Sequence, residues 1–151
     1  KPNIDNTKTF KITMPVSRES SFIGRMGEDL VSEYEYEYLK KTEYANKIIK
    51  HYEIVNDKPG WDITSYDLNG NEIYIEVKST KQKNISKIIL TKNELDALKD
   101  KKDKYFIYVV TGVFNEKEIK IEKIQNPIKL IENNTIKCEP NSYILDLRLK
   151  N

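Results

Sequence analysis

The segment 61–79 constrains the fold most, because it reads as two strands joined by a tight turn. Its two ends, 61–66 and 72–79, are rich in isoleucine and tyrosine, and the sequence DLNG separates them. An aspartate at the first position and a glycine at the fourth favour a type I turn that closes with a left-handed glycine, which gives a three-residue loop. In that register, opposed residues have numbers that sum to 138. Asp62 therefore lies opposite Glu76.

The hydrophobic pattern selects the same register. Residues i and i+2 point to the same face of a strand. One face of the predicted hairpin then holds Trp61, Ile63, Ile73, Ile75 and Val77. The other face holds Asp62, Thr64, Tyr66, Tyr74, Glu76 and Lys78. A two-residue loop would shift the register by one residue and bury Glu76 among the apolar side chains, at a cost of several kcal/mol.

Two carboxylates and an ammonium on one face of a hairpin suggest metal-assisted chemistry. Asp62 and Glu76 would lie about 5 Å apart and repel each other unless a cation lies between them. A divalent metal held by both carboxylates and by the carbonyl of Val77 would remove that repulsion. Such a metal polarises a phosphoryl oxygen and lowers the pKa of bound water. Lys78 would orient that water or stabilise developing charge, and Glu28 on the first predicted helix could reach the same centre.

The residue counts restrict the metal and exclude several other classes of chemistry. The chain has one histidine and one cysteine, so a Cys/His zinc site and paired-histidine catalysis are excluded. Oxygen ligands point to Mg²⁺, Mn²⁺ or Ca²⁺, and of these we expect Mg²⁺, with Mn²⁺ as a substitute. A single cysteine excludes an internal disulfide and fits a cytoplasmic protein. No apolar run has the length of a membrane span, and no glycine-rich nucleotide-binding loop occurs.

Basic residues are concentrated directly after the hairpin. Residues 78–104 contain nine lysines and four acidic residues, whereas the rest of the chain is slightly acidic. A basic segment beside a candidate phosphodiester-cleaving site suits a nucleic acid backbone, although lysine-rich surfaces are often only solvated. The side chains that we expect to contact phosphates are Lys81, Gln82, Lys83, Lys87 and Lys92.

The rest of the sequence predicts a helix before the hairpin and a helix after it. The first helix begins near Phe22 with Ser20 or Ser21 as its N-cap, and its apolar stripe runs from Ile23 to Tyr38. The second covers 91–100 and begins with a capping box that joins Thr91 to Glu94. The other predicted strands cover 48–55, 105–113, 118–124 and 143–149, and an irregular segment lies between the last two.

This order of elements defines the expected fold class and domain organisation. It predicts an α/β or α+β protein with a mixed β-sheet, an αβββαβ core and flanking helices. We expect a single domain over 22–151, with its core in 22–113 and C-terminal strands in 114–151. Residues 1–21 would form a polar leader or an edge segment.

Three short motifs resemble the PD-(D/E)XK nuclease superfamily: Gly27-Glu28, Gly60-Trp61-Asp62 and Glu76-Val77-Lys78. The longer strings IGRMGEDLV, GWDI, YIEVKST and LTKNEL resemble the NO VEIN C-terminal-type domain, which often occurs in large restriction-associated or ATPase-containing proteins. The resemblance covers about residues 22–113, and Trp61 stands where the superfamily has its nominal proline. It implies a restriction-endonuclease-like fold. It also implies that Asp62 and Glu76 are metal ligands, Lys78 the catalytic lysine and Glu28 an auxiliary acid.

Together these observations lead us to expect a Mg²⁺-dependent endonuclease domain. DNA is favoured over RNA as the substrate, and the setting would be a restriction or defence system. The alternative is a non-catalytic module that binds nucleic acid or protein and keeps the nuclease fold as a scaffold, since a fold does not imply an activity. A third possibility is a pure interaction domain for an attached ATPase or another domain of a larger protein. A dimer is plausible because many nucleases of this superfamily pair two active sites.

Overall fold

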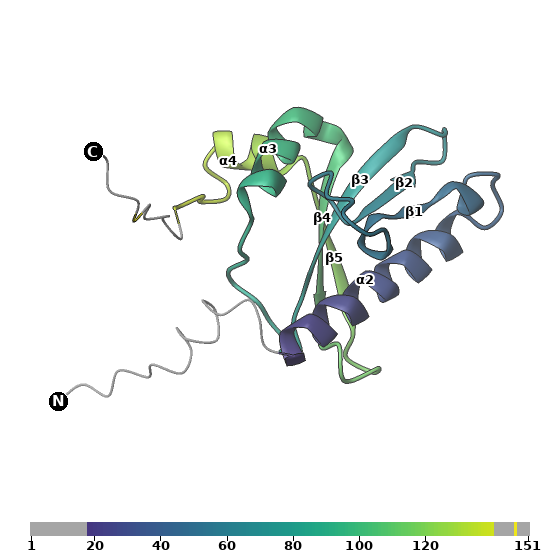
Figure 1. Ribbon diagram of the computed structural model, residues 1–151, viewed down its shortest axis with the longest axis horizontal. Coiled ribbons are helices and arrows are strands. Elements are labelled where there is room, and N and C mark those ends of the chain that lie inside the picture. The colour runs from purple at the N-terminus through teal and green to yellow at the C-terminus, as the bar shows by residue number, and fades with distance from the viewer. Residues whose placement is uncertain (1–17, 141–146, 148–151) are drawn as a thin grey trace.

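The computed structural model describes residues 18–140 and Leu147, and it contains a five-stranded mixed sheet with helices on both faces (Figure 1). The strands are β1 (Ile49–Lys50), β2 (Ile63–Tyr66), β3 (Glu72–Ser79), β4 (Tyr105–Thr111) and β5 (Lys120–Gln125). The α-helices are α2 (Arg18–Leu39), α3 (Lys92–Lys101) and α4 (Pro127–Glu132). Short 3₁₀ turns occur at η1 (Ala45–Lys47), η2 (His51–Glu53) and η3 (Lys102–Lys104).

The strands follow the order β1-β2-β3-β4-β5 across the sheet. Only β3 and β4 are parallel, and the chain between them crosses the sheet through α3. The other neighbours pair antiparallel. The sequence of helix, three strands, helix and strand is the predicted αβββαβ core, so the expected fold class is confirmed. No helix of the described part is long and apolar enough to cross a membrane.

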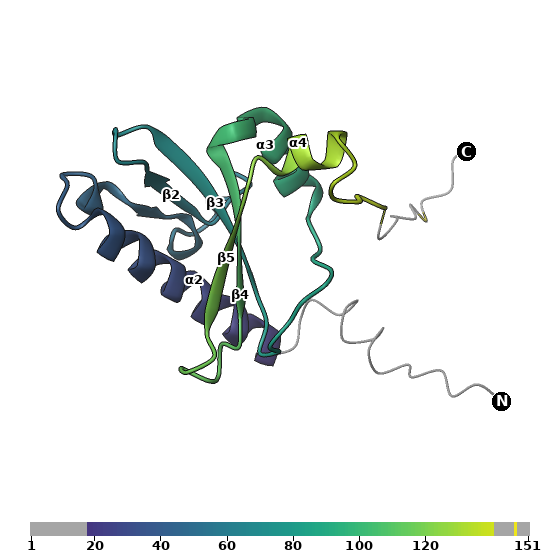
Figure 2. The same cartoon turned by 180° about the vertical axis from the view of Figure 1, so that it is seen from behind.

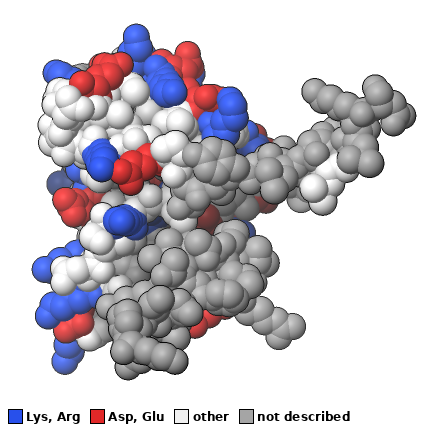
Figure 3. Space-filling model, turned by 90° about the vertical axis from the view of Figure 1, so that its left-hand side faces the viewer, with Lys and Arg blue, Asp and Glu red and all other residues white. Residues whose placement is uncertain are grey.

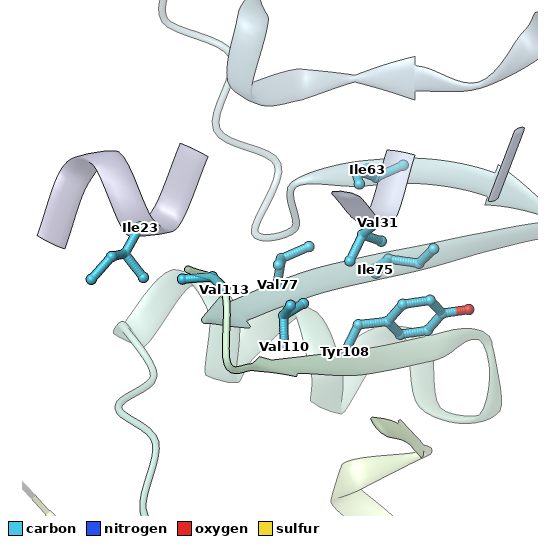
Figure 4. Packing of buried hydrophobic residues seen from close by; sticks show 8 residues of the cluster. All are labelled: Ile23, Val31, Ile63, Ile75, Val77, Tyr108, Val110 and Val113. Carbon is cyan, nitrogen blue, oxygen red and sulfur yellow. The ribbon is translucent and has the colours of Figure 1, made fainter. Parts of the chain in front are cut away.

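The sheet separates two apolar layers, and α2 lies on the face opposite α3 and α4 (Figures 1 and 2). Figure 4 shows the layer under α2, which consists of Ile23, Val31, Ile63, Ile75, Val77, Tyr108, Val110 and Val113. The layer under α3 consists of Ala97, Leu98, Tyr105, Ile107 and Val109. Because β4 alternates its side chains between the two layers, it is buried on both faces, as expected for a strand inside a sheet.

The hairpin has the predicted register. Ile63 pairs with Ile75 and Thr64 with Tyr74, and Gly70 has a φ of +84°. Trp61, however, does not share the face of Ile63. β2 begins only at Ile63, so strand alternation does not extend back to Trp61. Its ring packs against Tyr74 in the layer under α3, and the prediction for this residue was wrong.

Several predicted boundaries also differ from the structure. The strand expected at 48–55 is only Ile49–Lys50, because the chain turns into η2 directly afterwards. α2 begins at Arg18, so that Ser20 and Ser21 lie inside the helix rather than at its N-cap. Apart from Leu147, the strand expected at 143–149 lies outside the described residues. Part of the segment expected to be irregular forms α4, where Asn126 caps the first turn and proline follows it.

The buried side of α2 differs from the predicted stripe, which included two tyrosines. Most of its buried residues are spaced four apart. These are Ile23, Gly27, Val31, Glu35 and Leu39, whereas Tyr34 and Tyr38 are exposed. Glu35 is only 1% exposed. Its carboxylate accepts hydrogen bonds from the hydroxyl groups of Ser65 and Tyr108, both at 2.7 Å. These two donors compensate for the burial of a carboxylate between helix and sheet.

This buried network leads to a prediction about stability. Tyr108→Phe would leave one oxygen of Glu35 without its hydroxyl donor, and we expect the free energy of unfolding to fall by about 1–3 kcal/mol. Urea unfolding followed by circular dichroism measures this change. Tyr38→Phe is the control, because it removes an exposed hydroxyl group from α2, the helix that carries Glu35. Equal midpoints for the two variants would contradict the proposed contribution of the network.

Candidate functional site

The candidate site lies on the flank of β3 that β2 leaves uncovered. β2 pairs with β3 only as far as Ile75. Asp62 continues the ladder through its backbone, because its N–H donates to the carbonyl of Ile75 at 2.9 Å and its carbonyl accepts from the N–H of His51 at 2.9 Å. The Asp62 side chain turns towards the open flank, where Oδ2 accepts the N–H of Val77 at 2.8 Å. The predicted juxtaposition of Asp62 with the E-V-K segment is therefore present.

Glu76 and Lys78 lie beside Asp62 and are largely buried. The exposed fraction of Glu76 is 4%. Lys78 Nζ lies 3.0 Å from Glu76 Oε1 and 2.9 Å from Glu94 Oε2. Glu94 also forms the predicted capping box with Thr91. The capping box was the favoured explanation for Glu94, and its contact with Lys78 is a feature that the sequence did not predict.

Glu28 approaches the site from α2 because Gly27 lets the helix come very close to β3. A Cβ atom at Gly27 would lie 1.7 Å from Ser79 Oγ. Glu28, the next residue, lies near enough for the charges of Asp62 and Lys78 to affect its pKa. Its carboxylate is also 3.7 Å from the guanidinium of Arg25. The four predicted catalytic residues are thus brought together from α2, from the residue directly before β2, and from β3.

Burial and mutual repulsion raise the pKa values of the site's acids. The pKa of Glu76 is raised to about 9 and that of Glu28 to about 7. In both cases burial is the largest cause and the negative charge of Asp62 is the second. Burial also raises the pKa of Asp62, although the Val77 N–H opposes this shift. For Lys78, burial lowers the pKa, but the carboxylates of Glu76 and Glu94 together outweigh it and the net shift is upward. The site therefore holds more carboxyl groups than its single lysine can neutralise.

The oxygen donors of the site are of the kind that hard divalent cations bind. Within residues 18–140 and 147, no group of three or more His, Cys, Asp or Glu side chains is arranged as a metal site. Two carboxylates, Asp62 and Glu76, nevertheless adjoin the backbone of Val77. The N–H and C=O of one strand residue point to the same side, so the Val77 carbonyl faces the flank that Asp62 occupies. Because the pKa of Glu76 is raised to about 9, its protonated form is favoured at neutral pH without metal. A bound Mg²⁺ or Mn²⁺ would instead compensate the charge of the ionised carboxylate.

A second network, which the sequence did not reveal, supports the position of Asp62. His51 Nδ1 lies 2.6 Å from Asp57 Oδ2, and His51 Nε2 lies 2.7 Å from Thr64 Oγ1. Trp61 Nε1 donates to the same Thr64 oxygen at 2.9 Å. These contacts give both ring nitrogens of His51, the Thr64 hydroxyl and the Trp61 N–H a partner. The network thereby links Trp61, directly before Asp62, to Thr64, two residues after it.

The predicted phosphate-contacting residues are exposed, but three of them have acidic neighbours. Lys81 pairs with Glu19 at 2.6 Å, Lys83 with Glu118 at 4.0 Å and Lys92 with Asp96 at 2.7 Å. Gln82 and Lys87 lie in the exposed connection between β3 and α3. On the side of the molecule drawn in Figure 3, basic and acidic side chains are interspersed where they are visible. The predicted basic segment is therefore less positive in space than along the chain.

The raised pKa values predict how stability depends on pH. Glu28 and Glu76 hold their protons more tightly in the folded chain than in the unfolded chain, where the ordinary value is 4.5. As the pH rises above 4.5, the unfolded chain loses these protons first. We therefore expect the free energy of unfolding of the metal-free protein to fall as the pH rises through about 7 for Glu28 and about 9 for Glu76.

Urea unfolding in EDTA at a series of pH values tests this expectation. In Glu76→Gln, the free energy of unfolding should no longer fall between about pH 7 and pH 9, where only Glu76 contributes. Saturating Mg²⁺ should restore stability at high pH, by about 2.7 kcal/mol when its concentration is a hundred times Kd. If wild type and Glu76→Gln had the same pH profile, the carboxyl group of Glu76 would not be the cause of the stability loss at high pH.

The fold and the site together define a mixed-sheet α/β domain with a buried acidic centre organised around one lysine. A family model described as Protein NO VEIN, C-terminal, matches residues 27–124. The chain belongs to this family. Searches of curated proteins and of solved structures gave no match. The family assignment agrees with the finer of the two resemblances drawn from the sequence motifs.

Proposed function

We propose that this chain is a metal-dependent endonuclease domain of the PD-(D/E)XK type that hydrolyses phosphodiester bonds, with DNA as the favoured substrate. The observation that carries the proposal is the convergence of Asp62, Glu76 and Lys78 on the open flank of β3. This arrangement combines adjacent oxygen ligands with a fixed ammonium group. Its burial strengthens the electrostatic interactions that act on a bound phosphate.

Asp62, Glu76 and the carbonyl of Val77 are the groups that would hold Mg²⁺. When bound, the metal supplies a Lewis acid for the phosphoryl oxygens and a bound water of lowered pKa. In the hydrolysis, the water oxygen forms a bond to phosphorus, and the bond from phosphorus to the departing sugar oxygen breaks. The water proton must be accepted, and the departing oxygen must be protonated.

The chain's own residues account for the remaining roles. Lys78 places a positive charge beside the metal ligands, where it stabilises the negative charge that develops on the phosphate. Glu28 has a pKa near 7, so it can accept or release a proton at neutral pH. The connection that carries Lys81, Lys83 and Lys87 follows directly after β3 and is available for contacts to the nucleic acid backbone.

A restriction or defence system is the setting we propose for this activity, within a larger protein or together with an ATPase. The motivation is that the sequence motifs resemble a type of domain that often occurs in large restriction-associated or ATPase-containing proteins. Dimer formation would allow two sites to cut both strands of a duplex. Sedimentation of the protein with and without duplex DNA measures the oligomeric state, and a monomer in both samples would remove the dimer from the proposal.

Cleavage assays test the proposed activity. Supercoiled plasmid and end-labelled single-stranded and duplex DNA, with matching RNA, are incubated with Mg²⁺, Mn²⁺ or EDTA. The proposal expects nicking or linearisation that requires the metal and that proceeds faster on DNA than on RNA. Absence of metal-dependent cleavage of every substrate would contradict it. In that case, salt-sensitive DNA binding without metal dependence would identify a binding module that keeps the fold.

A further inference from the structure

Glu94 connects helix α3 to the candidate site through one oxygen atom. Its Oε2 accepts the backbone N–H of Thr91 at 2.9 Å and the ammonium of Lys78 at 2.9 Å. The Thr91 contact belongs to the capping box and is sufficient to explain a glutamate at this position. The Lys78 contact is additional. It is largely shielded from solvent, because the side chains of Lys78 and Glu94 are 19% and 15% exposed.

Lysine has a long, flexible stem, so its ammonium group needs partners to remain in one place. Glu76 contacts the Lys78 ammonium at 3.0 Å, and Glu94 contacts it from α3 at 2.9 Å. Glu76 is also a proposed metal ligand, so its charge is shared once a metal binds. Glu94 is then the carboxylate that remains available to hold the lysine.

Helix α3 gives Glu94 a rigid support. Next to it, Asn93 Nδ2 donates to the carbonyl of Lys58 at 2.9 Å. Gly60 lies so close to the helix that a Cβ atom there would be 2.8 Å from the Asn93 carbonyl oxygen. The first turn of α3 therefore contacts both Lys78 and the loop that leads into Asp62.

We propose that Glu94 is a positioning residue that holds the ammonium of Lys78 beside Glu76 in the geometry needed for phosphodiester cleavage. Glu94 does not contact the substrate in this proposal. This inference rests on the proposed nuclease function. The experiments below distinguish failure of the positioning role from failure of the nuclease proposal.

Glu94→Gln is the decisive variant because glutamine can replace glutamate in a capping box. It keeps the helix N-terminus but removes the charge that holds Lys78. We expect kcat for metal-dependent DNA cleavage to fall by about 10- to 100-fold, the scale known for outer-shell residues that orient metal ligands. We expect little change in KM, because the contact is not made to the substrate. A rise in KM with unchanged kcat would overturn the assignment.

Two control variants separate this role from a structural role. Asp96→Asn removes a carboxylate from the same helix, where it pairs with the exposed Lys92, and should leave kcat unchanged. Thr91→Ala breaks the capping box but leaves the charge of Glu94. It should lower the unfolding midpoint while reducing kcat much less than Glu94→Gln does. If Thr91→Ala reduced kcat as strongly as Glu94→Gln, the helix cap rather than the lysine contact would be the cause.

A second readout does not depend on cleavage. Acetic anhydride labels accessible lysine amines, and mass spectrometry gives the labelling rate of Lys78 in each variant. The proposal expects this rate to rise several-fold in Glu94→Gln and to stay at the wild-type value in Asp96→Asn. If wild type cleaves DNA but Glu94→Gln matches it in kcat, the positioning role is wrong and the nuclease proposal stands. If wild type does not cleave, the nuclease proposal fails, and unchanged labelling in Glu94→Gln would overturn the contact as well.

Discussion

Glu76→Gln is expected to abolish metal-dependent DNA cleavage while leaving the fold intact. Glutamine has nearly the shape of the protonated glutamate, which is the form favoured at neutral pH without metal because burial raises the pKa of Glu76 to about 9. The substitution therefore introduces no new buried charge and little steric change. It removes one of the two carboxylate ligands proposed for the metal. We expect kcat to fall by about 10²- to 10³-fold or more, the scale seen when a transition-state-stabilising group is removed.

Plasmid nicking and thermal unfolding, measured on the same preparations, test this expectation. Glu72→Gln is the matched control, because it removes an exposed carboxylate from the same strand at the end away from the site. It should cleave at the wild-type rate. In EDTA, Glu76→Gln should unfold at the wild-type temperature or above it. Cleavage by Glu76→Gln at the wild-type rate would remove Glu76 from the catalytic centre.

Gly27→Ala is expected to destabilise the packing of α2 on β3 strongly. The added Cβ would lie 1.7 Å from Ser79 Oγ and 2.7 Å from Ser79 Cβ, so rotation of the serine side chain cannot relieve the overlap. α2 would have to move away from β3. We expect the free energy of unfolding to fall by about 3 kcal/mol. Cleavage should fall as well, because Glu28 would move with the helix.

Two further variants identify the cause of this loss. Gly24→Ala places a methyl group on the same helix where no atom lies within 4 Å, so it should be neutral or stabilising by up to about 1 kcal/mol. Ser79→Gly removes the atoms that the alanine would meet. The double variant Gly27→Ala/Ser79→Gly should therefore be more stable than Gly27→Ala. Urea midpoints with unchanged m-values measure both effects. A double variant that is no more stable would place the strain elsewhere.

The hairpin and its acidic face could be predicted because local signals agreed. The turn residues before Gly70 and the alternation of apolar side chains both required the same register, and the structure has it. The capping box of α3 is also purely local, and it was predicted to the residue. Such features depend on neighbours in the chain, which a sequence displays directly.

The features that escaped prediction depend on contacts between distant segments. Glu35 looks like a solvent-facing residue, and only its donors Ser65 and Tyr108 make its burial possible. Glu94 likewise has a sufficient local role in the capping box, and its contact with Lys78 depends on how α3 packs beside β3. The lysine-rich segment is basic along the chain, but the pairing of Lys81 with Glu19 and of Lys83 with Glu118 is visible only in space.

The parallel pairing of β3 with β4 has a consequence for the time course of folding. The two strands are joined through α3, so their pairing closes a long loop, and such non-local pairing is slow relative to hairpin formation. The hairpin of β2 and β3 can form early and already brings Asp62 to Glu76. Glu28 and Glu94, however, come from elements on either side of that hairpin in the chain. During refolding, strand structure should therefore appear before the complete centre, and recovery of activity should coincide with the slowest phase.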